Sequence, residues 1–317
     1  MGKEILGIHH VTAIAGDPQK NVDFYTDILG LRLVKITVNF DDPETYHLYY
    51  GNEFGSPGSI LTFFPWPGAP RGRRGTGQLT VTSFSIPERA LGYWIERFKT
   101  HDISFEGPIT RFDEEVLIFF DPDDLKLELI AHPGSDVRKP WKEGPVPPEY
   151  AIRGFYSVTL SEQGNERTAP LLTETLGFRL DQEVENRFRY KVGAGGAGAL
   201  VDVLCLPDVP RGLVAVGTVH HVAWRTPNDE EQKTWCQEIS KLGYNVTPVL
   251  DRHYFHSIYF REPGGVLFEI ATDPPGFTVD EPQEELGTRL RLPPWLESRR
   301  AQIEQALPPL RLPVMVK

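Results

Sequence analysis

The feature that most constrains this chain is a short motif that occurs twice, His-His-Val at residues 9–11 and again at residues 220–222. Each copy lies in an alternating run of strand-forming residues, followed by a turn signal and then by a helix-like segment. Imidazoles on matched strands of a repeated unit can converge on one point when the units pack together. The motif therefore predicts a repeat fold with a metal site whose ligands are distant in sequence.

Four copies of one βαβββ unit fit the chain, and they open near residues 8, 79, 155 and 218. The expected helices cover 19–29, 88–100, a segment ending at 176, and 229–242, and the first ends at Gly30 as a C-capping glycine should. Unit one continues with strands at 32–39, 46–50 and 59–64, separated by turn-rich segments at 41–43 and 55–58. This order predicts an α+β fold of two tandem domains, each built from cupped mixed β-sheet with flanking helices.

A Pro- and charge-rich span at 133–149 is typical of a linker. It predicts an N-terminal domain at 1–140 and a C-terminal domain at 151–275, with two units in each. The remaining 276–317 form a tail in which Pro293 and Pro294 precede a predicted helix at 295–307. Its apolar side carries Leu296, Ile303 and Leu307, so we expect the tail to pack on the core.

Composition excludes several classes of protein. The net charge of −11 would repel a nucleic-acid backbone, and no apolar run approaches the roughly 18 residues of a membrane span. The N-terminus shows no export signal, and the two cysteines lack CxxC spacing. We expect a cytoplasmic enzyme that binds neither nucleic acid nor membrane, and an oligomer of identical chains is compatible with the sequence.

Superposition of the four units predicts a single metal site. The openings align His10, Thr80, Ser157 and His221, and the closing strands align Thr62, Glu128, Asp202 and Glu269. Only units one and four supply imidazoles, and only unit four adds a carboxylate. The predicted ligands are therefore His10, His221 and Glu269, whereas Glu128 is expected to bind no metal.

Only one ring of each His-His pair can face the inside of the cup, because successive strand residues point to opposite faces. His10 and His221 share their faces with small or polar residues, whereas His9 and His220 alternate with valines. This favours His10 and His221 as ligands. His9, His220 and Thr12 are then outer neighbours that tune the site, or residues with simple packing roles.

Two imidazoles and one carboxylate on one face of a divalent ion leave about three coordination positions open, an arrangement that suits non-haem Fe(II). Mn(II) is the alternative metal, because its ligand preferences overlap with those of Fe(II). A structural zinc site would need four closed ligands, usually including thiolates, and neither cysteine occupies a matching position.

The chain resembles the vicinal oxygen chelate superfamily, which includes glyoxalases, extradiol dioxygenases and bleomycin or fosfomycin resistance proteins. The resemblance rests on the βαβββ repeats, the two His-His-Val openings and the closing Pro-Gly-Gly-Val-Leu-Phe-Glu at 263–269. It is closer still to the bacterial chlorohydroquinone and hydroquinone ring-cleaving dioxygenases, through segments at 46–53, 55–58, 62–65 and 276–278. In that family the second His of each pair and the closing Glu bind Fe(II).

The same resemblance implies roles for Arg252 and Tyr259, which match an Arg and a Tyr near the metal in those enzymes. Arg252 would hold an anionic phenolate, and Tyr259 or His9 would move a proton. His256 has no counterpart and is placed outside the site. The expected substrates are a small aromatic diol, of the hydroquinone or catechol type, and O2.

Two other functions are compatible with the superfamily. A glyoxalase-like isomerase or thiol transferase uses a fourth protein ligand from the matching closing strand, and that position here is Thr62. A hydroxyl is a poor substitute for a carboxylate. A sequestering protein of the bleomycin-resistance kind would bind a drug without metal, and the predicted triad argues against it.

Overall fold

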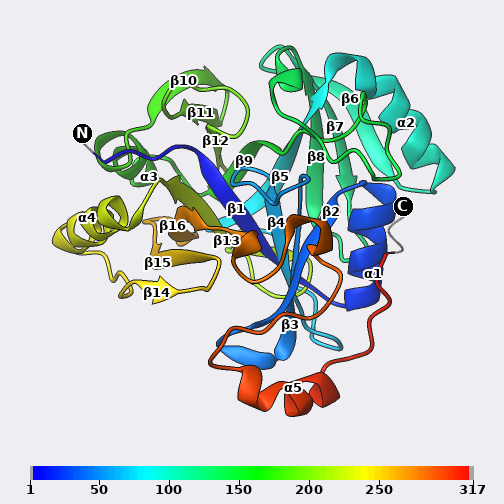
Figure 1. Cartoon of the computed structure of the whole chain (residues 1–317). Coiled ribbons are helices and arrows are strands. Elements are labelled where there is room, and N and C mark those ends of the chain that lie inside the picture. Colours follow the sequence, from blue (N-terminus) through cyan, green and yellow to red (C-terminus); the bar gives the residue numbers. More distant parts are fainter. Residues whose placement is uncertain (1–2, 314–317) are drawn as a thin grey trace.

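The computed structural model, which describes residues 3–313, contains two eight-stranded mixed β-sheets with helices on their outer faces (Figure 1). The strand order is β14-β15-β16-β13-β1-β4-β3-β2 in the first sheet and β10-β11-β12-β9-β5-β8-β7-β6 in the second. Each of the four modules has the order strand, helix, three strands. The predicted α+β fold of four βαβββ modules is therefore confirmed.

The first sheet combines modules one and four. Module one consists of β1 (Ile8–Ala15), α1 (Pro18–Asp23), a π-helical turn (Phe24–Ile28), β2 (Arg32–Asn39), β3 (Asp42–Gly51) and β4 (Ile60–Pro65). Module four consists of β13 (Thr218–Thr226), α4 (Asp229–Lys241), β14 (Leu250–Asp251), β15 (Phe255–Arg261) and β16 (Leu267–Pro275).

The second sheet combines modules two and three. Module two consists of β5 (Gln78–Pro87), a 3₁₀ turn (Glu88–Ala90), α2 (Leu91–Thr100), β6 (Phe105–Arg111), β7 (Glu114–Phe120) and β8 (Lys126–His132). Module three consists of β9 (Phe155–Glu162), α3 (Thr168–Pro170), a π-helical turn (Leu171–Thr175), β10 (Arg179–Val184), β11 (Arg187–Lys191) and β12 (Leu200–Cys205). A 3₁₀ turn (Ser135–Val137) lies in the connection between the modules.

Each sheet is organised around a central antiparallel pair formed by two opening strands. β1 pairs with β13 and β5 pairs with β9, and each of these strands also pairs in parallel with the closing strand of its own module. All eight residues of β1 are buried, as expected for a strand covered on both faces. The two His-His-Val strands consequently lie side by side, although they come from opposite ends of the chain (Figure 1).

Each sheet thus takes one module from each half of the chain. The domain bounds at 1–140 and 151–275 follow the chain connectivity, while the hydrogen bonds of both sheets cross between these halves. The bounds themselves stay a prediction.

Two local predictions differ from the structure. The turn expected at 41–43 is shorter, because β3 already begins at Asp42. In module two, the position that matches His221 is Val81, where Thr80 was expected. Ser83 pairs with Glu128 in the same way as Ala223 pairs with Glu269. Val81 precedes Ser83 by two residues, as His221 precedes Ala223. A register shift between Leu79 and Val81 explains the difference.

The C-terminal tail packs on module one. It contains 3₁₀ turns (Phe277–Val279, Gln283–Glu285 and Glu297–Arg299) and the short helix α5 (Arg300–Ala306), so the predicted helix is shorter than 295–307. Leu296, Ile303 and Leu307 are buried together against Val38 of β2, as predicted. Figure 1 shows the tail, orange to red, passing beside β2 and below β3 before it runs along α1.

Within residues 3–313 there is no helix with the length and apolar character needed to cross a membrane. The cytoplasmic location and the assembly of identical chains stay predictions.

A buried pair of carboxyl groups joins modules three and four and predicts a dependence of stability on pH. Burial, and then the charge of Glu262, raise the pKa of Glu162 from 4.5 to about 8. The folded chain therefore keeps a proton that the unfolded chain releases, and stability falls as pH rises from about 4.5 to 8. We expect Glu162→Gln to remove this fall and to make the protein more stable than the wild type at pH 9.

Urea unfolding midpoints of the wild type and of Glu162→Gln at pH 6 and pH 9 measure this effect. Glu174→Gln, at an exposed position of module three, is the matched control. A difference between Glu162→Gln and the wild type that does not grow with pH would contradict the prediction.

Candidate active site

Three neighbouring strands bring the predicted ligands together. β13 pairs with β1 on one side and with β16 on the other, and Glu269 of β16 pairs with Ala223, two residues after His221. Because alternate residues of a strand face the same side, His221 and Glu269 lie on one face of the sheet, and His10 of β1 joins them. All three residues are buried, and their ligand atoms lie within 4.8 Å of one another.

The geometry of this cluster calls for a cation. The Nε2 atoms of His10 and His221 lie 3.2 and 2.9 Å from the same oxygen of Glu269, Oε2. They are 3.3 Å from each other. Glu269 Oε2 accepts no regular hydrogen bond, although it is buried. Three electron-pair donors converge where a divalent metal would satisfy all of them.

The outer imidazoles fix the orientation of the inner ones. Nε2 of His9 lies 3.1 Å from the carbonyl oxygen of Thr272, so it must carry a proton and donate. Burial, and then the neighbouring His10, lower the pKa of His9 well below its usual value, so the ring is neutral and its Nδ1 accepts. His10 Nδ1, 2.9 Å away, must then be the donor, and Nε2 is the His10 nitrogen that faces Glu269.

His220 stands in the same relation to His221. The two Nδ1 atoms are 2.7 Å apart, and burial, followed by the charge of His221, lowers the pKa of His220 to about 3. Each inner imidazole thus has a second ring behind it, and the role of His9 and His220 in tuning the site stays a prediction.

Glu269 is held in its ionised form. Burial alone would raise its pKa, but the imidazoles of His10 and His221 keep the pKa well below the usual value. Its other oxygen, Oε1, accepts a short hydrogen bond from the Ser257 hydroxyl. The sequence reasoning did not identify Ser257.

Ser257→Ala should weaken metal binding while leaving the three ligands in place. The hydroxyl holds the carboxylate in orientation, and loss of such an outer partner typically costs about 10- to 100-fold in metal affinity. Competition with a chromogenic Fe(II) chelator measures the change. Ser83→Ala is the matched control, because Ser83 donates to Glu128 in the other sheet at 2.8 Å. Equal affinity in the two variants would remove Ser257 from the site.

A cavity of about 380 Å³ opens from the two inner imidazoles. Its walls are largely aromatic, and they come from both modules of the first sheet: Phe40, His47, Tyr49, Phe64, Trp66, Phe255 and Tyr259. This volume and lining suit a small, flat, apolar molecule that reaches the cluster with one polar edge.

Arg252 and Tyr259 both line this cavity, as the resemblance implied. The Arg252 guanidinium lies 5.4 Å from the centre of the Tyr259 ring and pairs with Asp41 at 3.0 Å. The Tyr259 ring lies 5.6 Å from that of His221, and burial, then the charge of Glu269, raise the pKa of Tyr259. A fixed positive charge and a protonated phenol therefore face the space next to the cluster.

The site lies on a fold shared with known proteins. The model of the Glyoxalase/Bleomycin resistance protein/Dioxygenase superfamily matches residues 7–129 and 162–270. The chain belongs to this superfamily. The resemblance inferred from the repeats is thereby confirmed.

Several members of the superfamily are similar over nearly the whole chain. A Bacillus subtilis protein that carries the provisional name of ring-cleaving dioxygenase is 48% identical over 312 residues, which are 98% of this chain and 99% of that protein. The chlorohydroquinone/hydroquinone 1,2-dioxygenase of Sphingobium indicum is 35% identical over 307 residues, 95% of each chain. A crystal structure of a provisionally named dioxygenase from Bacillus subtilis superposes with a TM-score of 0.94 at 48% identity, covering 98% and 99% of the two chains.

More distant members share the fold alone. The structure of glyoxalase I from Zea mays superposes with a TM-score of 0.61 at 16% identity, covering 86% of this chain and 93% of that chain.

Thr12 and Thr62 belong to a hydrogen-bonded row that the sequence reasoning mostly missed. Thr62 Oγ1 lies 2.9 Å from Thr12 Oγ1 and 2.8 Å from Nε2 of His47, whose Nδ1 is 2.8 Å from the Tyr49 hydroxyl. His47 and Tyr49 lie in the segment 46–53, which supports the family resemblance but was not predicted to belong to the site. Their alternation with Tyr46 and Leu48 was a signal that two polar rings share one strand face.

The second sheet has no counterpart of the metal cluster among the described residues. Glu128 faces Arg111, whose two terminal nitrogens lie 2.8 and 2.9 Å from its oxygens. Asp202 is held in the same way by Arg189, with Arg187 as a further partner. Guanidinium groups thus satisfy the carboxylates of Glu128 and Asp202, and the expectation that Glu128 binds no metal stays a prediction. His256 also lies apart, paired with Asp229 at 2.7 Å.

Proposed function

We propose that the chain is an Fe(II)-dependent ring-cleaving dioxygenase that acts on a small aromatic diol of the hydroquinone or catechol type. The observation that carries this proposal is the buried cluster of His10, His221 and Glu269, whose two imidazoles line an aromatic-walled cavity. The names of relatives at 35–48% identity support ring cleavage as the reaction.

Bound to this cluster, Fe(II) would supply the redox chemistry and the open positions that a diol and O2 require. Mn(II) fits the same three ligands and is the alternative metal. The ligand set carries one negative charge, from Glu269, so the loaded site would keep about one net positive charge and favour a monoanionic diol.

The protein's own groups bind and orient that anion. Arg252 offers a permanent positive charge and a planar fork of donors at the cavity wall. Tyr259, protonated because burial raises its pKa, can donate a hydrogen bond or a proton to a developing oxyanion. The rings of Phe64, Trp66 and Phe255 stack against the substrate and exclude water.

A glyoxalase-like reaction is the alternative, and the surroundings of Thr62 argue against it. Such enzymes need a fourth protein ligand at this position, but the Thr62 hydroxyl is already engaged by Thr12 and His47. Drug sequestration without metal would give no function to the convergence of two buried imidazoles on one oxygen of Glu269.

Oxygen consumption separates these functions. The protein is reconstituted anaerobically with Fe(II) or with Mn(II), mixed with substituted hydroquinones and catechols, and followed with an oxygen electrode. The same preparations receive a hemithioacetal of methylglyoxal and glutathione. Oxygen uptake with a diol supports the proposal, whereas hemithioacetal turnover without oxygen uptake would assign the chain to the glyoxalase alternative.

A further inference from the structure

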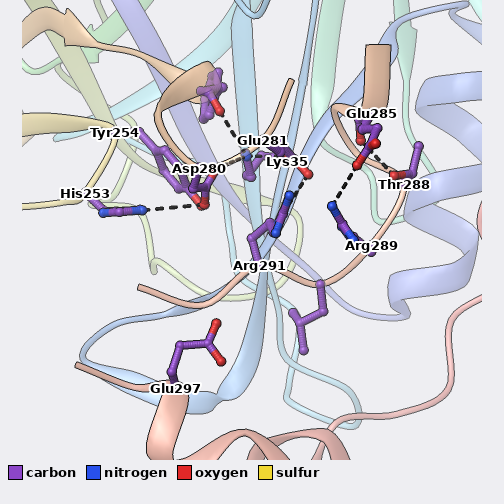
Figure 2. Close-up of polar contacts among 12 residues, drawn as sticks. Lys35, His253, Tyr254, Asp280, Glu281, Glu285, Thr288, Arg289, Arg291 and Glu297 are labelled. Atoms are coloured by element: carbon purple, nitrogen blue, oxygen red, sulfur yellow. Dashed lines mark hydrogen bonds and ion pairs between the residues drawn. The ribbon is translucent and has the colours of Figure 1, made fainter. Parts of the chain in front are cut away.

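A fully buried lysine ties the C-terminal tail to the edge of the first sheet. Lys35 of β2 donates to Asp280 Oδ1 at 2.7 Å, to the carbonyl oxygen of Phe277 at 3.1 Å, and to Glu281 through a short contact. Its three protons therefore meet three acceptors, all supplied by the tail. Figure 2 shows Lys35 next to Asp280 and Glu281.

The charges of this cluster balance within it. Glu281 also binds Arg291 at 2.8 Å, so two cations face two carboxylates. Lys35 and Glu281 have no exposed side-chain surface, and loss of either partner would leave an uncompensated buried charge. The tail is thus fixed to β2 at Asp280 and Glu281, and we call these two residues with Lys35 the tail latch.

The tail latch also holds the turn that precedes β15. Asp280 Oδ2 accepts a hydrogen bond from the Tyr254 hydroxyl at 3.0 Å and lies 3.5 Å from His253 Nε2. The backbone N–H of Gly276 donates to the Tyr254 carbonyl at 2.8 Å. In Figure 2, Tyr254 and His253 both approach Asp280 from the side opposite Arg291.

The other two residues of this turn belong to the active site. Arg252 lines the cavity, and the Phe255 ring lies 5.1 Å from that of His9 and 5.0 Å from that of His10. The turn is tight: Tyr254 N–H donates to the Arg252 carbonyl at 2.7 Å, and His253 has a left-handed backbone with φ of 66°. A shift at Tyr254 would therefore displace Arg252.

The tail latch spans the open side of the cup. β14 and β2 are the two outer strands of the first sheet, so no strand pairing joins them. Lys35 comes from β2, and Tyr254 follows β14. Asp280 contacts both Lys35 and Tyr254, and the cavity is lined from beside both strands, by Phe40 after β2 and Leu250 of β14.

We infer that Lys35, Asp280 and Tyr254 are positioning residues for the reaction, and that the tail latch sets the place of the Arg252 guanidinium through the turn at 252–255. This inference rests on the proposed function, because Arg252 acts on the diol there. The tail then completes the active site, in addition to packing on the core.

Tyr254→Phe tests the inference with the smallest change. It removes one hydroxyl that contacts Asp280 and leaves the ring in place. We expect unchanged iron content and melting temperature, a loss in kcat/KM for oxygen uptake of about three- to tenfold, and faster hydrogen exchange of residues 250–256. Because the effect passes through Arg252, Tyr254→Phe should add little further loss in a chain that already carries Arg252→Lys.

Tyr46→Phe is the matched control. It removes a hydroxyl that donates to the tail at the carbonyl of Pro308, 3.0 Å away, far along the tail from Asp280. We expect wild-type oxygen uptake and wild-type exchange at 250–256.

Exchange and turnover together separate this inference from the proposed function. Faster exchange at 250–256 in Tyr254→Phe alone supports the tail latch even if the wild type consumes no oxygen with any diol, which would sink the proposed function instead. Unchanged exchange overturns the inference even in an active enzyme. A loss of activity that adds in full to that of Arg252→Lys also overturns it, because the tail would then act by another route.

Discussion

His221→Ala is expected to bind iron at least about a hundredfold more weakly than the wild type and to lose oxygen uptake. The substitution removes one of three protein ligands, and even the loss of an outer partner of a ligand commonly costs 10- to 100-fold in affinity. It also leaves Glu269 Oε2 with a single imidazole neighbour, since the other one, 2.9 Å away, disappears. Elemental analysis of the purified variant and steady-state oxygen uptake measure the two effects.

Two matched variants define the control. His256→Ala removes an imidazole from the partly exposed pair with Asp229, outside the cavity, and should keep iron and turnover. Glu128→Gln removes the carboxylate that superposes on Glu269 but is occupied by Arg111, and should keep iron as well. Full iron occupancy with normal turnover in His221→Ala would sink the assignment of the triad.

The repeat could be predicted from the sequence because its signals are local. Each signal spans only a few consecutive residues: the alternation within a strand, a helix-capping glycine such as Gly30, or the His-His-Val motif. The choice of His10 and His221 over their neighbours also followed from alternation, and the structure places the Nε2 atoms of these two rings on one oxygen of Glu269.

Other features depend on contacts between distant segments and could not be read from local patterns. The pairing of module one with module four is set by hydrogen bonds between β1 and β13, which no local pattern encodes. The shift from Thr80 to Val81 arises from an irregularity in the pairing of β5 with β9.

The functions of Ser257 and Lys35 also depend on contacts between distant segments, and they could not be predicted for that reason. Ser257 has no distinguishing sequence signal, because its function depends on its contact with Glu269 of the neighbouring strand. Lys35 has the sequence context of an ordinary charged strand residue. Burial against Asp280 and Glu281 gives Lys35 its function, and those residues lie about 245 positions further along the chain. Signals of this kind become visible only when the tail is folded against β2.

Arg252→Lys is expected to keep iron yet to lose oxygen uptake by on the order of tenfold or more. The guanidinium contacts Asp41 at 3.0 Å and lies over the Tyr259 ring at 5.4 Å while it faces the cavity. Lysine keeps the charge, but its ammonium lacks the planar fork that serves several partners at once. Weakening one charge-assisted hydrogen bond of about 1.5–3 kcal/mol in the transition state gives a loss of this size.

The rival interpretation makes Arg252 a surface residue whose pairing with the exposed Asp41 is worth within about 0.5 kcal/mol. Arg289→Lys provides the control for the substitution itself, since Arg289 pairs with Glu285 on the exposed surface of the tail. Oxygen uptake by the iron-loaded variants decides between the two interpretations. Unchanged turnover and unchanged substrate affinity in Arg252→Lys would remove Arg252 from the site, and the cavity would then act on its substrate through the His10, His221 and Glu269 cluster alone.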